Sequence, residues 1–453
     1  MTKKNGERAN WSGQMAFILA AAASAVGLGN LWRFPASAAT YGGGIFILVY
    51  IALFFVFGVF LMITEIAVGR ATRLSAVSAF ASLNRKWAAV GWLGTLVPAL
   101  ILPYYCVIGG WVLRYLWGYL VHPGGMAEKE FFAAFTACPA ETLGCTAVFA
   151  AATFAMIYLG VKKGIEGSNK VLMPLLLALT VGVAAFTVTR PDAAPGLKYY
   201  LVPDFSRLCN PDGSFSPALL AKTVLAAMGQ MFFSLSLAMG ILVTYGSYMP
   251  KSADIGRSSL RIGVIDTFVA VLAGAIIIPP AFAFGGEELA RTAGVGLMFV
   301  SLPQVFAALP GGSVVAVAFF ALALFAALTS AISIAETVVA SLCDFFRFHR
   351  RGATTLTAVY VALAAVPSAL SLAFLDRTDF ITNSIFMPVC ALLTCIFIGW
   401  VGRPGFVRDE VTALGVKFGS YPVYRFIIRY LAPVLIATIL VTYVLARFGL
   451  IQF

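Results

Sequence analysis

Two short segments of the chain combine glycines with hydroxyl and amide side chains in a way that suits joint binding of a cation and an anion. Residues 20–30 contain Gly27, Gly29 and Asn30, and residues 229–240 contain two serines between two glycines. Each segment lies in a long uncharged run. Helices unwound within a membrane expose carbonyl oxygens to a cation and N–H groups to an anion. Close packing of small residues is the other explanation for such glycines.

Charged residues lie on both sides of these segments. Arg33 follows the first segment by one helical turn, where an unpaired charge near the bilayer core costs about 2.5 to 3.5 kcal/mol. Asp376 and Asp379 begin a later apolar run and can supply its partner. Arg8 and Asp344 form a second candidate pair on the opposite side. Two ion pairs flanking one site would act as alternating gates, although an arginine at a helix end can also reach the membrane interface alone.

The elements that must hold these residues are membrane-spanning helices. Of the 453 residues, 61% are hydrophobic and 11% are charged, and the mean hydropathy is +0.94. Such a composition indicates a bilayer protein, and about 20 helical residues cross the hydrocarbon core. The uncharged runs cover residues 14–32, 43–64, 87–113, 142–161, 171–189, 223–250, 267–286, 352–375, 380–402 and 430–446.

A further uncharged run, residues 292–335, is too long for one crossing and contains Pro303 and Pro310. We therefore divide it into a hairpin or re-entrant loop and a spanning helix from about 314 to 346. The total is eleven crossings. We expect an all-α polytopic membrane protein.

The two glycine-containing segments occupy corresponding places if crossings 1–5 and 6–10 are two repeats. This pattern predicts an inverted 5+5 repeat with discontinuous helices 1 and 6, followed by an eleventh helix. The repeats would cover about 10–190 and 216–402 of a single transporter domain, residues 1–453, with helix 11 at about 422–449.

The charge distribution predicts the orientation of the chain. The formal net charge is +12, but in a membrane protein the position of the Lys and Arg residues is more informative than their sum. Most of the 31 fall on one side, which predicts a cytoplasmic N-terminus and an extracytoplasmic C-terminus in the plasma (inner) membrane. The first helix would direct insertion, since no cleavage site follows it. We expect no nucleic-acid partner and no obligate protein partner.

Other classes of function have little support in the sequence. The two His residues lie at helix ends and the seven Cys residues have no metal-ligand spacing, so neither a nucleophile–base pair nor a metal cluster predicts an enzyme. No short pore motif indicates a channel. Cys138, Cys145 and Cys209 lie near the outer face, where one disulfide among them can form.

The stretch Gly-Leu-Gly-Asn-Leu-Trp-Arg-Phe-Pro at residues 27–35, followed by three glycines at 42–44, strongly resembles the neurotransmitter:sodium symporter family. The similarity continues through residues 65–70, 104–105, 230–237, 326–330 and 376–379 to helix 11, and covers nearly the whole chain. The family's twelfth helix is absent, as in bacterial amino-acid transporters of the eleven-helix type. The resemblance implies a sodium-coupled symporter that works by alternating access.

The resemblance also implies two sodium sites made of oxygen ligands, which suit a hard cation. The first would use the substrate carboxylate and four residues of this chain, Ala25, Asn30, Ser234 and Asp266. The second would join helix 1 to helix 8 through Ala23, Val26, Ala326, Thr329 and Ser330. Sodium bound there would favour one arrangement of the broken helices over another.

Gly27 stands where monoamine carriers of the family have Asp, so the substrate should bring its own carboxylate. The family's substrate site maps onto Ser24, Ala25, Gly27, Leu28, Gly29, Ile101, Tyr105, Phe233, Ser234, Ser236, Met239, Ser330 and Ile334. The side-chain end of this set contains no ionisable group, which favours a neutral, hydrophobic α-amino acid. A non-α amino acid or a betaine-like solute is the alternative, because Gly27 permits it too.

One departure from common family patterns concerns ions, and one agreement with them concerns dynamics. Asp266 replaces the usual Asn, and Ala270 stands where many members have Ser or Glu; the fixed charge beside the first sodium makes a separate anion less necessary, so we predict chloride-independent transport. Gly164 and Pro174 match a family pattern for local unwinding of helix 5. A proline inside a span removes a backbone donor, which independently predicts a weak point.

Overall fold

A computed structural model describes residues 9–291, 295–402 and 405–447 of the chain. The described residues form helices and no strand, with only two isolated bridges, Gly43 to Pro203 and Cys209 to Phe215. A helix satisfies every backbone polar group within its own segment, which hydrocarbon surroundings demand. The prediction of an all-α membrane protein is confirmed.

Nine continuous helices among the described residues are long and apolar enough to cross a bilayer. Three are single α-helices: α8 (Pro139–Tyr158), α15 (Gly312–Phe345) and α16 (Arg350–Leu370). A fourth, α13 (Ile255–Ala290), is α-helical but kinked at Gly285 and Gly286, whose backbone angles are not helical. The other five spans each contain a wider or tighter turn. Three of them lie in the first half of the chain: α3 (Gly44–Leu53), η2 (Phe54–Gly58) and α4 (Val59–Thr72) form one, η3 (Arg85–Trp87) and α6 (Ala88–Val121) the next, and η5 (Val161–Glu166) and α9 (Gly167–Val188) the third. The last two consist of α17 (Leu372–Phe380), η8 (Ile381–Phe386), α18 (Met387–Ile396) and η9 (Phe397–Val401), and of α20 (Tyr421–Phe426), η10 (Ile427–Leu431) and α21 (Ala432–Arg447).

Two further crossings are broken near their middle, as predicted. The first consists of α1 (Gln14–Ala25) and of η1 (Gly29–Arg33) with α2 (Phe34–Thr40), bent by 53°. The second consists of α11 (Pro217–Ser234) and α12 (Ile241–Ser247), separated by residues 235–240. By length and apolarity the described residues contain nine continuous candidate spans and a tenth in the first broken helix, while α11 and α12 together would supply the predicted eleventh. The exact limits of the two repeats remain a prediction.

The long apolar run after α13 was predicted to begin with a hairpin or re-entrant loop. Its first half forms a short apolar helix, η7 (Leu297–Ser301) continued by α14 (Leu302–Ala308), while residues 292–294 lie outside the described part. Pro303 lies within this continuous helix, where its missing N–H leaves the Phe299 carbonyl, four residues earlier, without a helical donor; the Tyr115 hydroxyl donates to that carbonyl at 2.5 Å. Gly311, with φ 70°, reverses the chain into α15.

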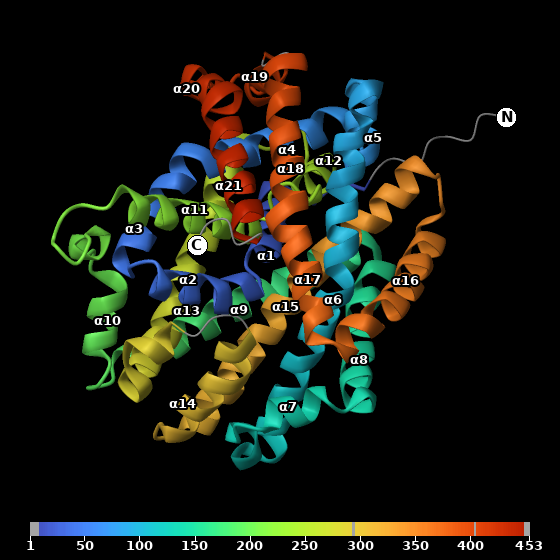
Figure 1. Cartoon of the computed structure of the whole chain (residues 1–453). Coiled ribbons are helices and arrows are strands. Elements are labelled where there is room, and N and C mark those ends of the chain that lie inside the picture. Colours follow the sequence, from blue (N-terminus) through green and yellow to red (C-terminus); the bar gives the residue numbers. More distant parts are fainter. Residues whose placement is uncertain (1–8, 292–294, 403–404, 448–453) are drawn as a thin grey trace.

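Short helices mark the two ends of the bundle (Figure 1). The end carrying α5 (Ala76–Leu83) and α19 (Gly405–Thr412) also carries the N-terminal side of the chain. The opposite end carries α7 (Phe131–Thr136), α10 (Ala194–Leu201) and α14, with η4 (Pro123–Ala127) and η6 (Phe205–Leu208) in the same connections. Following the predicted orientation, we call these the inner and the outer end.

The broken helices lie in the centre of the molecule, where α1 packs against α13 and α15, α12 against α4, and α11 against α3. Residues 20–23 of α1 are four alanines, all fully buried. Such small residues let helices approach closely without a hydrophobic driving force from water. Close packing therefore accounts for the alanines of α1, whereas Gly27 and Gly29 lie at its break.

Candidate functional site

The breaks of the two discontinuous helices face each other. Ser236 Oγ donates to the Ser24 carbonyl at 3.2 Å, and Gln230 Nε2 donates to the Gly29 carbonyl at 3.2 Å. The free N–H of Leu28 points to the Tyr105 hydroxyl of α6 at 3.4 Å. Backbone groups released by one break are thus bonded by the other break and by a neighbouring span.

The second break is held in a backbone conformation that L-residues rarely adopt. Ser236 has φ 53°, Ala238 has φ 60° and Gly240 has φ 64°. The buried carboxylate of Glu65, in α4, accepts a hydrogen bond from the Ala238 amide at 2.7 Å. A left-handed non-glycine residue costs about 1 to 2 kcal/mol. Glu65 offsets part of this cost and fixes the position of the break.

One buried cavity of about 20 Å³ lies between the breaks. Its walls contain every residue that the sequence assigned to the substrate, together with Asn30. These are Ser24, Ala25, Gly27, Leu28, Gly29, Ile101, Tyr105, Phe233, Ser234, Ser236, Met239, Ser330 and Ile334. The space holds little more than one water molecule. The binding roles of these residues remain predictions, but their gathering around one point is a property of the fold.

Two glycines of the first break lie where no side chain fits. A Cβ on Gly27 would lie 2.7 Å from Ser330 Oγ and 3.1 Å from the Tyr105 hydroxyl. A Cβ on Gly29 would lie 2.5 Å from the Phe233 ring. Neither contact is tolerated without a shift of the neighbour. The absence of a side chain at residue 27 lets the first break approach Ser330 and Tyr105 closely.

The predicted first sodium site is a compact cluster of oxygen and amide groups. Asp266 is fully buried; its Oδ1 accepts from Asn30 Nδ2 at 2.7 Å, and both of its carboxylate oxygens lie within 3.0 Å of Ser234 Oγ. Asn30 Oδ1 accepts from the Gly27 amide at 3.0 Å, and Ala25 lines the adjoining cavity. A carboxylate, a hydroxyl, an amide and carbonyls together suit a hard cation.

The predicted second sodium site lies where the end of α1 meets α15. Ser330 Oγ donates to the Ser24 carbonyl at 3.1 Å and approaches the Val26 carbonyl at 3.4 Å. Thr329, fully buried, donates to the Ala326 carbonyl of its own helix at 3.1 Å. Ala23 is likewise fully buried at this end of α1. In the described part of the chain no three His, Cys, Asp or Glu side chains gather around one point.

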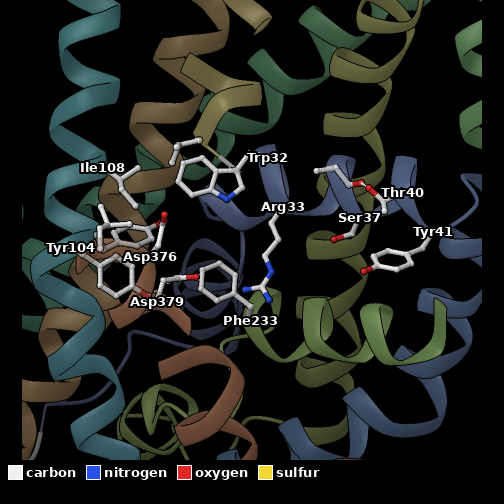
Figure 2. Close-up of a pocket in the computed structure, with 14 residues that line it drawn as sticks. Trp32, Arg33, Ser37, Thr40, Tyr41, Tyr104, Ile108, Phe233, Asp376 and Asp379 are labelled. Atoms are coloured by element: carbon white, nitrogen blue, oxygen red, sulfur yellow. Dashed lines mark hydrogen bonds between the residues drawn. The ribbon is translucent and has the colours of Figure 1, made fainter. Parts of the chain in front are cut away.

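A wider vestibule of about 370 Å³ opens on the outer side of this cavity (Figure 2). Arg33, Asp376 and Asp379 all line it, as the predicted outer gate requires. However, no ion pair joins Arg33 to either aspartate, all three being within the described residues. The guanidinium lies over the Phe233 ring, 5.3 Å from its centroid, and Figure 2 shows the two aspartates beyond that ring.

Among the described residues, the Asp379 carboxylate forms hydrogen bonds with neutral side chains and no ion pair with Arg33. It accepts from the Tyr104 hydroxyl at 3.0 Å and from Asn383 Nδ2 at 2.6 Å. These bonds account for the separation of the predicted pair in this arrangement of the helices.

The predicted inner gate is only partly described. Arg8 lies outside the described residues. Asp344 accepts from the Ser75 amide at 2.7 Å, where Ser75 precedes α5. Two turns earlier on α15, the fully buried Glu336 forms an ion pair with Arg350 at 2.6 Å and accepts from the Tyr248 hydroxyl at 2.8 Å. A charged pair therefore does lie at this end, but between spans 8 and 9.

The N-terminal segment also closes the inner end. The Trp11 ring meets Tyr245 and Tyr248 edge-on, with centroids 5.2 and 6.0 Å apart. Its Nε1 donates to the Tyr245 carbonyl and its backbone N–H to the Tyr248 carbonyl, each at 3.0 Å. Both tyrosines belong to the region of α12, so the start of helix 1 is fastened to the end of helix 6.

Helix 5 has an irregular turn where unwinding was predicted. Residues 161–166 form the π-helical turn η5, which includes Gly164, while Pro174 lies within α9. A Cβ on Gly164 would lie 1.8 Å from the Met156 carbonyl, so the close approach of this turn to the end of α8 requires glycine. The structure thus places the predicted weak point at a wide turn, and its opening during transport remains a prediction.

Several residues of the site were not identified from the sequence. The Tyr50 hydroxyl donates to Asp266 Oδ2 at 3.3 Å, and Asn383 and Arg350 hold Asp379 and Glu336 as described above. An aromatic residue in an apolar span ordinarily indicates packing, so Tyr50 gave no separate signal. Cys138, Cys145 and Cys209 are not joined by a disulfide.

Comparison with known proteins gives a consistent result. A family model described as "Sodium:neurotransmitter symporter family" matches residues 8–128 and 140–450. An uncharacterized sodium-dependent transporter of Bacillus subtilis, YhdH, is 35% identical over 86% of this chain and 87% of its own length. A similarly named protein of Haemophilus influenzae is 30% identical over 98% of this chain and 99% of its own.

A more distant relative and a solved structure are also similar to this chain over most of its length. The mouse sodium- and chloride-dependent GABA transporter 2 is 23% identical over 96% of this chain and 80% of its own length. The crystal structure of MhsT in complex with L-phenylalanine superposes with a TM-score of 0.85 at 36% identity, covering 96% of this chain and all of that one.

Proposed function

We propose that this chain, which belongs to the sodium:neurotransmitter symporter family, imports a neutral, hydrophobic α-amino acid by alternating access. Sodium-coupled transport of a small molecule is the activity of the family. The proposal concerns the finer points: the class of substrate, the two sodium sites, the independence from chloride and the direction of the chain in the membrane.

The observation that carries the proposal is the cavity between the two breaks. Its polar end offers the amides of the first break and the Tyr105 hydroxyl, which are donors for a carboxylate. Its other end consists of Ile101, Met239 and Ile334 with no ionisable group. The MhsT structure, similar over the whole chain, contains L-phenylalanine, which supports an amino acid of this kind here.

Two sodium ions would couple this cavity to the membrane gradient. Asp266, Asn30 and Ser234 with the Ala25 carbonyl would hold the first, and Ser330, Thr329 and the carbonyls of Ala23, Val26 and Ala326 the second. Each set joins a broken helix to a continuous one, so an ion stabilises one relative position of the two. The amino-acid carboxylate would complete the first set, which makes substrate and ion binding mutually dependent.

Chloride independence follows from the charge of Asp266. This carboxylate is buried among Asn30, Ser234 and Tyr50 and carries its negative charge directly to the first ion site. Ala270, one turn later, is buried and offers no hydroxyl. Uptake should therefore keep its rate when gluconate replaces external chloride. A severalfold decrease would contradict this part of the proposal.

The central experiment measures uptake by the full chain in proteoliposomes, with and without an inward sodium gradient. Alanine, leucine, tryptophan and GABA compete against the labelled substrate. We expect competition by hydrophobic α-amino acids and none by GABA; the reverse order would favour the alternative of a non-α amino acid or betaine-like solute. If no amino acid binds in saturating sodium, the proposal fails.

The positive residues at the inner end support an orientation with the N-terminus in the cytoplasm. Labelling of a single cysteine introduced beside residue 417, compared with one beside residue 213, tests this from either side of intact cells. Modification of the first by an impermeant reagent from outside would reverse the proposed orientation.

A further inference from the structure

A second cavity, of about 420 Å³, lies at the outer end beside the vestibule. Thr40 and Tyr41, at the end of α2, line both spaces. In Figure 2 these two residues lie on the side of the vestibule away from Asp376 and Asp379. The second cavity is therefore separate from the acidic side of the vestibule, and its size lies within the range of sites for small molecules.

The walls of this cavity are cationic. Arg207 from η6, Lys222 from α11 and Arg291 after α13 line it, and none of its lining residues is acidic. Three positive side chains from three separate elements converge on one hollow, although like charges repel. Such an arrangement favours an anion between them.

The two arginines are held in place by groups outside the cavity wall. Glu287 pairs with Arg207 at 2.9 Å and also with Arg291, and Asp204 lies 3.7 Å from Arg207. The Arg207 guanidinium lies 4.3 Å from the centroid of the Tyr199 ring. One carboxylate shared by two arginines leaves donors of both available, and the ring keeps one of them in position.

Lys222 differs from the two arginines. It lies half-buried in the second turn of α11 and forms no hydrogen bond or ion pair with any residue that the structure describes. Its neighbour Thr223, also in the cavity wall, donates to carbonyls of Leu219 and Tyr41. The ammonium group of Lys222 is therefore available to a ligand in the cavity, and replacing this lysine removes no hydrogen bond or ion pair within the described residues.

We propose that this outer cavity binds an oxyanion, a carboxylate or phosphate group, between Lys222 and the two arginines. Several acceptor oxygens match several converging donors, and charge-assisted hydrogen bonds of this kind are the strong ones. The group can belong to a free solute in the external medium or to a phospholipid headgroup of the outer leaflet. Because Tyr41 and Thr40 form the common wall, the bound anion would contact the outer half of broken helix 1.

The test titrates the purified full chain with inorganic phosphate and follows its thermal midpoint by tryptophan fluorescence, since a ligand that binds the folded state raises this temperature. Sodium and ionic strength are constant, with chloride as the balancing anion. We expect saturation for the unmodified chain. Lys222→Gln should raise the apparent dissociation constant roughly tenfold, and Lys222→Arg should restore most of the affinity.

Lys198→Gln is the matched control, because Lys198 lies on neighbouring α10 at the same end but lines another cavity. It should leave the phosphate affinity unchanged within about twofold. Absence of saturable binding, or equal loss of affinity in both glutamine variants, would overturn the proposal. Equal loss would mean general charge screening at the outer surface.

Repeating the titration in lipid nanodiscs distinguishes the two sources of the anion. With phosphatidylcholine alone, phosphate should bind as in neutral detergent. If added phosphatidylglycerol weakens phosphate binding to the unmodified chain but not to Lys222→Gln, the site takes a lipid headgroup. If it has no effect, the site takes a free solute. Both results support an oxyanion site.

Discussion

The outer and inner ends of the molecule treat their charges in opposite ways. At the outer end Arg33 lies over an aromatic ring, and the aspartates of its vestibule are bonded to neutral groups or to none. At the inner end Glu336 and Arg350 form a close pair, and Glu336 also accepts from Tyr248, whose ring packs on Trp11. The inner side of the site is thus held together by an ion pair and ring contacts, whereas on the outer side Arg33 is separated from the aspartates. This describes a transporter whose outer path is the wider one.

Breaking the inner ion pair should have the largest effect. Glu336→Gln leaves Arg350, whose side chain is 30% exposed, without its charged partner, and this loss costs up to about 3 kcal/mol. We expect sodium-driven uptake to fall at least about a hundredfold, with faster hydrogen exchange in residues 14–25. The same substitution at Glu141, whose pair with Arg114 is exposed, is the control and should change little. Nearly normal uptake in Glu336→Gln would show that the pair does not hold the inner end.

A substitution in the central site should weaken sodium binding without loosening the inner or the outer end of the molecule. Asp266→Asn keeps the shape of the side chain but removes its charge, so the apparent sodium affinity should fall roughly ten- to a hundredfold. Chloride should then partly restore uptake, because an external anion can replace the lost charge. Hydrogen exchange at both ends should stay as in the unmodified chain. Unchanged sodium dependence would place the first ion elsewhere.

Arg33→Gln should separate binding from transport. The ion pair is absent in the arrangement described here, so equilibrium binding of sodium and substrate should remain within about twofold. Uptake should fall roughly fivefold, because closing the outer end would bring Arg33 to an aspartate. Equal losses in binding and uptake would mean that Arg33 acts on the site directly. Arg377→Gln, a nearby arginine outside the vestibule lining, is the control.

The smallest effect is expected for Trp11→Phe. This change keeps an aromatic ring between Tyr245 and Tyr248 but removes the hydrogen bond of the indole nitrogen, worth about 1 kcal/mol. Hydrogen exchange at the start of α1 should become about threefold faster, with uptake only slightly reduced. Trp11→Ala, which removes the ring as well, should have a clearly larger effect if the ring contacts contribute.

The sequence predicts the central site better than its two gates. The breaks near Gly27 and Ser236 follow from small and polar residues in apolar runs, whose backbone must find other partners. The resemblance then assigns the cavity residues, because they lie on a few turns of helices 1, 3, 6 and 8. Once the family resemblance is identified, all of the cavity residues can therefore be assigned together. The first half of the run from 292 to 335 was less certain, since a short apolar segment fits either a hairpin or a helix.

The gates depend on the arrangement of the helices, which one sequence does not specify. Arg33 has Asp379 within its region of the molecule, yet Tyr104 and Asn383 bond that carboxylate in this arrangement. The partner of Glu336 was missed for a different reason. Arg350 lies 14 residues further along, across the turn between two spans, and helical spacing gives no signal for such a pair.

The left-handed residues Ser236 and Ala238 have a kinetic consequence. Reforming a continuous helix 6 would require these backbone angles to change sign and Ala238 to release Glu65. Starting a helical turn is slow and unfavourable compared with extending one. Because the joint already exists, the two half-helices can swing as rigid levers on the microsecond-to-millisecond scale of domain hinges. The turnover rate would then be limited by breaking and forming the ion pairs and ring contacts at the two ends of the molecule, and not by refolding of helix 6 at the centre.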